Sequence, residues 1–274
     1  MRMALEEADD SDTILHPNPE SGEHPLLTSR KDGVDINLNM LWDYNHVISF
    51  KMNDGSKRMS LIPTTMHEDM VLLHKKCRGC WSMHGMRWHP DVDKPVNSNL
   101  IEQKMDFLYM MHLYDATLSG KYWMINVCLD SDIPVCGVDF ITYAVEKATP
   151  WFNILGDGYV GLAPRADKDL LESVRNNVLD QMHHKNMIQE RVFGVHTHMY
   201  NSTEDPSQMR FGGYNKDLIR EGKEIHWFQT TSKKSWGLNI HAGGFHTNLF
   251  LQNNTMDTHA VIEPGYPYIA MPKK

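Results

Sequence analysis

Short runs of alternating apolar and polar residues, separated by turn-forming residues, cover most of this 274-residue chain. One run, NHVISFKM, ends at Met52 and is followed by the sequence NDGS at residues 53–56. The Asp-Gly step supplies the positive φ that a tight hairpin requires. A second strand-like run then continues to Leu73, so residues 42–73 are expected to form a β-hairpin.

The same period of two recurs further along the chain. Apolar residues alternate with less apolar ones over residues 105–113, and a second strand is expected over residues 122–129, after a turn at Ser119-Gly120. A helical pattern falls within residues 166–184, where an apolar face repeats every three to four residues. Short strands are expected at residues 192–199, 208–214, 224–230, 235–240 and 259–263. The chain should therefore be mainly β, with one notable helix.

Composition excludes two classes of function. The formal net charge is −8 and no cluster of Lys and Arg occurs, so nucleic acid is not an expected partner. No apolar run approaches the roughly 20 residues of a membrane-spanning helix, and none is expected. Residues 1–24 are acidic, contain two prolines and lack the features of a signal peptide, which predicts an extended tail.

One segment resembles a known family. DGYVGLAP, residues 157–164, is similar to the element that ends the first lobe of pepsin-like aspartic proteases and leads into a helix. Six further elements resemble that family and follow in its order: NHVISF at 45–50, YDATLSG at 114–120, VFGV at 192–195, FGGYN at 211–215, Trp227 with SWGL at 235–238, and HAVIEPG at 259–265. The resemblance spans residues 42–272 and implies a pepsin-like double-β-barrel fold.

In that family, two aspartates on D-T-G turns, one from each lobe, share a proton across a bound water and hydrolyse peptides. At the first turn of this chain the aspartate position falls on Pro63, or on Thr64 if the register slips by one. At the second turn Glu263 replaces the aspartate. Glu68 and Asp69 follow the first turn at the wrong offset. Because a lone carboxylate cannot form the pair, the catalytic dyad is expected to be lost.

Two further departures concern the rest of the cleft. The segment that resembles the flap keeps Tyr114, but Asp-Ala-Thr replaces the Gly-Thr-Gly of the family. The sequence ends at Lys274, soon after the second turn, so an incomplete C-terminal lobe is expected. The expected organisation is an extended acidic arm over residues 1–40, an N-terminal lobe over 41–190 and a truncated C-terminal lobe over 191–274. A sheet edge left open in this way is a natural docking surface.

The cysteines admit more than one interpretation. Cys77 and Cys80, followed by His84 and His89, have spacings that a zinc site could use. The resembled family instead implies a small disulfide loop in this region, and a reduced pair is a third reading. Apart from zinc on these four residues, no cofactor is expected. Trp81 and Trp88 nearby are candidates either for anchors at an interface or for a cap over the first lobe.

These observations favour a non-catalytic aspartic-protease homologue that serves as a structural or accessory subunit and binds other proteins in a larger assembly. The alternatives are an active or residual aspartic-type endopeptidase and a module that binds peptides without cleaving them. The four cysteines and the lack of a signal peptide favour an intracellular location, with a mitochondrial complex as one candidate.

Overall fold

The computed structural model describes residues 33–41, 45–52, 57–82, 94–95, 103–109, 114–131, 135–154, 156–164, 177–197, 207–219, 221–231, 235–240, 243–246, 251–254 and 258–264. Strands dominate this part of the chain, so the prediction of a mainly β protein is confirmed. None of the helices described is long and apolar enough to cross a membrane.

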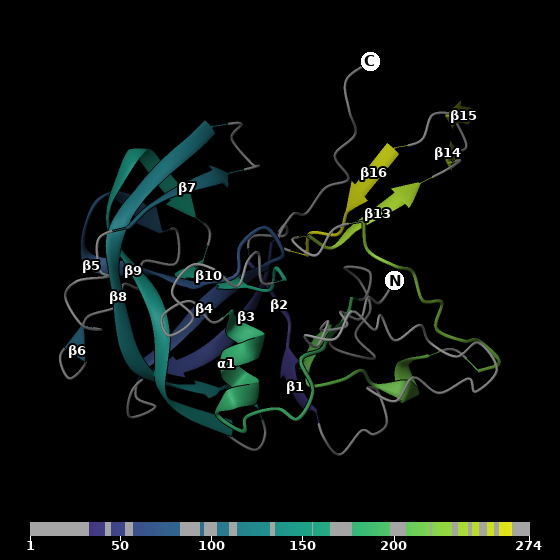
Figure 1. Ribbon diagram of the computed structural model, residues 1–274, viewed down its shortest axis with the longest axis horizontal. Helices are drawn as coiled ribbons and strands as arrows, with labels where there is room; N and C mark the ends of the chain where they lie inside the picture. Colours follow the sequence, from purple (N-terminus) through teal and green to yellow (C-terminus); the bar gives the residue numbers. More distant parts are fainter. Residues whose placement is uncertain are drawn as a thin grey trace, which may run out of the picture.

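A closed β-barrel fills one side of the molecule (Figure 1). Its strands follow one another around the barrel as β3 (Asn45–Met52), β4 (Lys57–Thr64), β10 (Gly158–Gly161), β5 (Met70–Ser82), β9 (Val135–Ile154) and β8 (Tyr114–Leu129). The ring closes because β8 also pairs with β3, with Phe50 opposite Leu129. Closure satisfies the backbone groups that an open edge would leave unpaired.

The expected hairpin is confirmed as the pair β3 and β4, which run antiparallel with Met52 opposite Lys57. The NDGS segment between them lies outside the described residues. Short strands extend this sheet: β2 (Asn39–Leu41) pairs with β3, while β6 (Lys94–Pro95) and β7 (Gln103–Tyr109) pair with β8. Strand β7 confirms the first part of the strand expected over residues 105–113.

Strand β10 belongs to the DGYVGLAP segment and lies between β4, to which it is parallel, and β5, to which it is antiparallel. Close backbone packing requires a glycine at position 161 of this segment. A Cβ at this position would stand 2.5 Å from the carbonyl oxygen of Asp69, closer than real Cβ contacts allow. The glycine thus lets the end of β10 run directly beside the backbone that follows β4.

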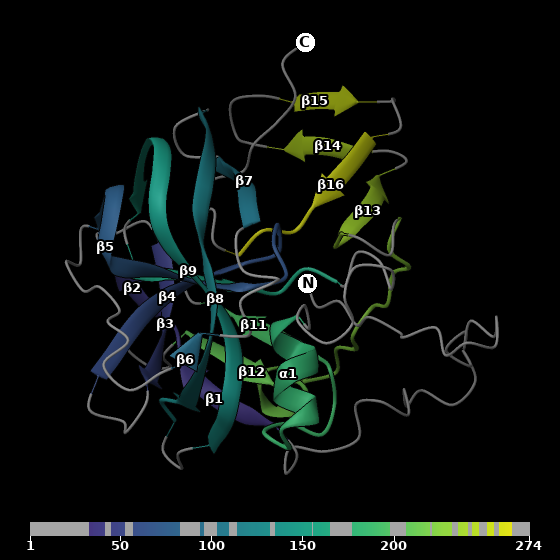
Figure 2. The same ribbon diagram turned by 60° about the vertical axis from the view of Figure 1, so that its left-hand side comes forward.

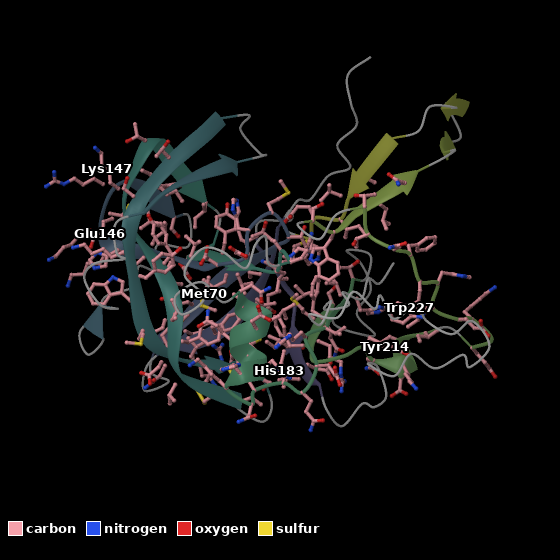
Figure 3. The ribbon with its side chains drawn as sticks, in the orientation of Figure 1. Met70, Glu146, Lys147, His183, Tyr214 and Trp227 are labelled. Carbon is pink, nitrogen blue, oxygen red and sulfur yellow. A yellow bond between two sulfur atoms is a disulfide. The ribbon has the colours of Figure 1, made fainter. Side chains whose placement is uncertain are left out.

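Alternate residues of the barrel strands enter two separate cores. On β5, Met70 and Leu72 belong to one cluster, and Val71 and Leu73 belong to the other. Met70 is fully buried, and its position is labelled in Figure 3. The period of two recognised in the sequence therefore reflects burial on both faces of these strands.

The larger core joins the barrel to a three-stranded sheet and a helix. The sheet consists of β1 (Val34–Asn37), β12 (Gln208–Phe211) and β11 (Phe193–His196), with β12 in the centre. Helix α1 (Val178–His184) packs beside it (Figure 2), with Val178 and Met182 in the shared core. Strand β1 brings residues of the expected N-terminal arm into this sheet. The helix prediction is confirmed over these seven residues, and residues 165–176 lie outside the described part.

Two small strand pairs lie together on one side of the barrel in both views (Figures 1 and 2). They are β13 (Gly237–Ile240) with β16 (Thr258–Val261), and β14 (Gly243–His246) with β15 (Leu251–Asn254). Strands β13 and β16 confirm the strands expected near the end of the chain. A short 3₁₀ helix, Lys216–Leu218, precedes them and is capped by Asn215.

Two expectations are wrong. Ser119-Gly120 is not a turn, because β8 continues through it with only a register shift against β9. Glycine is needed there since a Cβ on Gly120 would clash with the backbone of Ala144. Residues 224–230, expected to be a strand, are in no strand. Their alternating pattern predicted a strand, but pattern alone does not supply a paired neighbour.

Candidate active-site remnant

The two turns that correspond to the catalytic turns of the family meet in the structure. Thr64 is the last residue of β4, and Glu263 follows β16. The backbone N–H of Thr65 donates to Glu263 Oε2 at 2.8 Å, and the Thr65 hydroxyl lies 2.8 Å from the same oxygen. Two segments that lie about 200 residues apart in the sequence are therefore in direct contact.

Thr64 is the residue that faces the remaining carboxylate. Its hydroxyl donates to Glu263 Oε2 at 3.2 Å and accepts a hydrogen bond from the backbone N–H of Met66 at 3.1 Å. Since that oxygen already accepts from Met66, its single hydrogen is directed at the carboxylate. Pro63 lies one position earlier, within β4 and opposite Val160 of β10. Of the two registers considered, the one that places Thr64 opposite Glu263 fits these contacts.

Thr65 joins the two turns. Besides its contacts with Glu263, its hydroxyl donates to the carbonyl oxygen of Ile262. The threonine is only 2% exposed. A hydroxyl has one hydrogen, so Thr65 serves Ile262 and Glu263 alternately, while its backbone N–H remains on the carboxylate.

Trp236 holds the second turn against the DGYVGLAP segment. Its ring is buried, and its Nε1–H donates to the carbonyl oxygen of Leu162 at 2.6 Å. Leu162 in turn donates its backbone N–H to the carbonyl of Thr64 at 2.7 Å, and Ile262 donates to the carbonyl of Trp236 at 3.3 Å. A continuous chain of hydrogen bonds therefore runs from Thr64 to the residue before Glu263. The sequence placed Trp236 in a family motif but did not reveal this role.

A second carboxylate lies nearby but is turned into the protein. Asp69 is 9% exposed, and its Oδ1 accepts from the Tyr122 hydroxyl at 3.4 Å. Burial raises the pKa of Tyr143 well above its usual range, with the charge of Asp69 adding to the effect. Asp69 thus faces a tyrosine pair whose rings meet edge to face at 5.1 Å.

One titratable group sits just after the first turn. Burial lowers the pKa of His67 to about 4, so the imidazole is neutral near neutral pH. Its backbone carbonyl accepts a hydrogen bond from Ala163, the residue after Leu162. His67 is therefore built into the contact between the first turn and the DGYVGLAP segment.

The flap candidate, residues 114–120, begins strand β8, which pairs antiparallel with β7. Tyr114 begins β8 and pairs with Tyr109 at the end of β7. Residues 110–113, between the two strands, lie outside the described part. Residues 114–120 form only the second arm of the hairpin.

The cysteines of the candidate metal site bond to each other. Cys77 and Cys80 form a disulfide within β5, and both are buried, so their sulfurs are not available as thiolate ligands in this state. His84, His89 and Trp88 lie outside the described residues. In the part of the chain that is described, no cluster of three potential metal ligands occurs. Trp81 is 46% exposed.

The arrangement around Thr64 places the hydroxyl of Thr64 and two donors of Thr65 on the carboxylate of Glu263. General acid–base hydrolysis by a dyad needs a second acid at hydrogen-bond distance, and the Thr64 hydroxyl lies at that distance from Glu263 Oε2. A hydroxyl with the pKa of an alcohol cannot serve as a base near neutral pH.

Comparison with known proteins identifies a family. A family model described as eukaryotic aspartyl protease matches residues 102–274, more than half of the chain. No curated protein matches the chain.

Proposed function

Because the chain belongs to the eukaryotic aspartyl protease family, we propose that it is a non-catalytic member of that family that acts by binding other proteins, as an accessory subunit of a larger assembly. The observation that carries this proposal is the contact between Thr64 and Glu263. In an active member both positions are carboxylates. Here a single acid meets two threonines.

The surroundings of Glu263 support a structural role for it. Its Oε2 receives hydrogen bonds from Thr64 and Thr65. Hydrogen bonds of this kind to a charged acceptor are worth about 1.5–3 kcal/mol each. The carboxylate is thus well suited to fix the second turn against the first lobe, an attachment that a binding protein needs as much as an enzyme does.

The alternative of a module that binds peptides without cleaving them has one observation in its favour. The hairpin of β7 and β8 that corresponds to the flap is formed, with Tyr109 paired to Tyr114. A flap without a dyad could still cover an extended peptide. This alternative predicts that the isolated chain binds a peptide and that substitutions in the hairpin weaken this binding.

The test of the accessory-subunit proposal is native purification of the full chain from its own cells, followed by gel filtration and measurement of subunit stoichiometry. We expect the chain to elute with at least one partner in fixed ratio. The variant Glu263→Gln weakens the attachment of the second turn. It should therefore co-elute with a smaller amount of that partner. Elution as a stable monomer, with or without this change, would contradict the proposal.

A further inference from the structure

A polar pocket opens at the end of the barrel remote from Glu263. It has a volume of about 310 Å³. Its lining comes from β1, β2, β3, β4 and the residues after β8, namely Ile36, Asn37, Asn39, Ser49, Arg58, Asp130 and Ser131. Arg58 precedes Thr64 by six positions on the same strand, which at about 3.3 Å per residue places it roughly 20 Å away. The pocket is therefore separate from the active-site remnant.

Two members of a three-membered ion cluster, Arg58 and Asp130, line one wall of this pocket, and the third, Lys51, lies behind Asp130. Asp130 forms two salt bridges, one with each carboxylate oxygen. Lys51 Nζ lies 2.8 Å from Oδ1, and Arg58 Nε lies 2.7 Å from Oδ2. Two cations and one anion leave a net charge of +1. The Asp130 side chain is 13% exposed and the Arg58 side chain 62%, so the anion lies at the base and the excess positive charge faces solvent.

Arg58 retains donors that this cluster does not use. Asp130 engages Nε, and for the two terminal nitrogens no partner is recorded among the described residues. A guanidinium presents these nitrogens as a planar fork that matches both oxygens of a carboxylate. The side of the guanidinium that remains open thus has the geometry of an oxyanion receptor.

The other walls favour a small and polar ligand. Asn37 and Asn39 are exposed, and each side-chain amide both donates and accepts hydrogen bonds, as a peptide group requires. Ile36 is the apolar member of the lining. A volume near 300 Å³ is at the small end of ligand pockets, which limits the ligand to about two residues of a peptide.

We propose that this pocket binds the C-terminal carboxylate of a peptide chain, with the fork of Arg58 on the carboxylate and the asparagine side chains on the last peptide groups. The net positive charge attracts the anion. Asp130 orients the guanidinium through Nε, and Lys51 neutralises the second oxygen of Asp130.

The test uses the full chain and N-acetyl-dialanine as the probe, titrated by calorimetry or by NMR at low salt. We expect saturable binding of the free acid and at least tenfold weaker binding of the corresponding amide. Arg58→Gln should weaken binding of the acid at least tenfold. The affinity of Arg58→Lys should lie between those of the parent and Arg58→Gln, because lysine keeps the charge but not the planar fork. The matched control is Arg78→Gln, on an exposed arginine of β5, which should bind as the parent does.

Equal binding of acid and amide, or an Arg58→Gln variant that binds like the parent, would overturn the proposal. Tighter binding of inorganic phosphate than of the peptide acid would also overturn the proposal, because the pocket would then be a phosphate site. Circular dichroism and the melting temperature should show that Arg58→Gln folds, since Arg58 is mostly exposed and Lys51 remains on Asp130. Probe binding is measured on the isolated chain and requires no partner subunit, so the outcome here is independent of the proposed function.

Discussion

The indole Nε1–H of Trp236 donates to the carbonyl oxygen of Leu162 at 2.6 Å, and this contact ties the segment that carries Glu263 to the segment that supports Thr64. Trp236 also meets Phe193 edge to face at a centroid distance of 5.2 Å. Its ring therefore links strand β11, the DGYVGLAP segment and the second turn.

Trp236→Phe should lower the free energy of unfolding by about 1–3 kcal/mol, because it keeps an aromatic ring but leaves a buried carbonyl without its donor. Urea unfolding followed by far-UV circular dichroism measures the change. The control is Trp81→Phe, at a ring that is 46% exposed, which should change stability by less than about 0.5 kcal/mol. Equal effects of the two substitutions would show that the Leu162 contact contributes nothing.

Thr65→Val should also destabilise the protein, by roughly 1–3 kcal/mol. The substitution preserves shape but removes the hydroxyl that lies between Ile262 and Glu263. Thr65→Ser, which restores the hydroxyl, should recover most of the loss. Thr149→Val, at an exposed threonine of β9, is the control. If valine and serine behave alike at position 65, the hydroxyl does not hold the two turns together.

The order of elements was predictable because it depends on local patterns. The NDGS sequence predicted the hairpin of β3 and β4, and the DGYVGLAP segment contains β10. The register at Thr64 was not predictable, because the motif favoured Pro63, with Thr64 one position away, and only long-range hydrogen bonds to Glu263 distinguish the two. The pocket at Arg58 was also missed, since β1, β4 and the end of β8 become neighbours only through barrel closure.

Acid should destabilise the folded chain through His67. Burial lowers its pKa from about 6.5 to about 4 in the folded state, so between these values the unfolded chain binds a proton that the folded chain does not. The free energy of unfolding therefore falls as the pH drops from 6.5 towards 4, by roughly 3 kcal/mol at most. Burial lowers the pKa of His46 in the same direction.

Unfolding free energies of the parent and of His67→Gln, measured from pH 7 to pH 4, test this prediction. The substitution should flatten the pH dependence in that window, whereas His226→Gln, at an exposed site, should leave it unchanged. A parent and a His67→Gln variant with the same slope would contradict the assignment.

All four cysteines of the chain pair in the structure, Cys77 with Cys80 and Cys128 with Cys136. We predict that thiol titration of the denatured, unreduced protein will detect no free thiol. Cys128 and Cys136 stand opposite each other on β8 and β9; replacing both with alanine should cost about 2–3 kcal/mol, as expected for a loop of this size. Four titratable thiols in protein from its native source would contradict the pairing.

Disulfides persist in oxidising compartments. The thiol measurement therefore also bears on location, and a result of no free thiols would favour an oxidising compartment over the intracellular one that the cysteine count suggests.

The most direct test of the central claim is peptide hydrolysis by the purified chain from pH 2 to pH 7, with a peptide library read by mass spectrometry. We predict no cleavage above background for the parent chain or for Pro63→Asp. Pepstatin-sensitive cleavage in acid should appear only when Thr64→Asp restores a second carboxylate opposite Glu263. Pepstatin-sensitive cleavage by the parent that is abolished by Glu263→Gln would contradict the account.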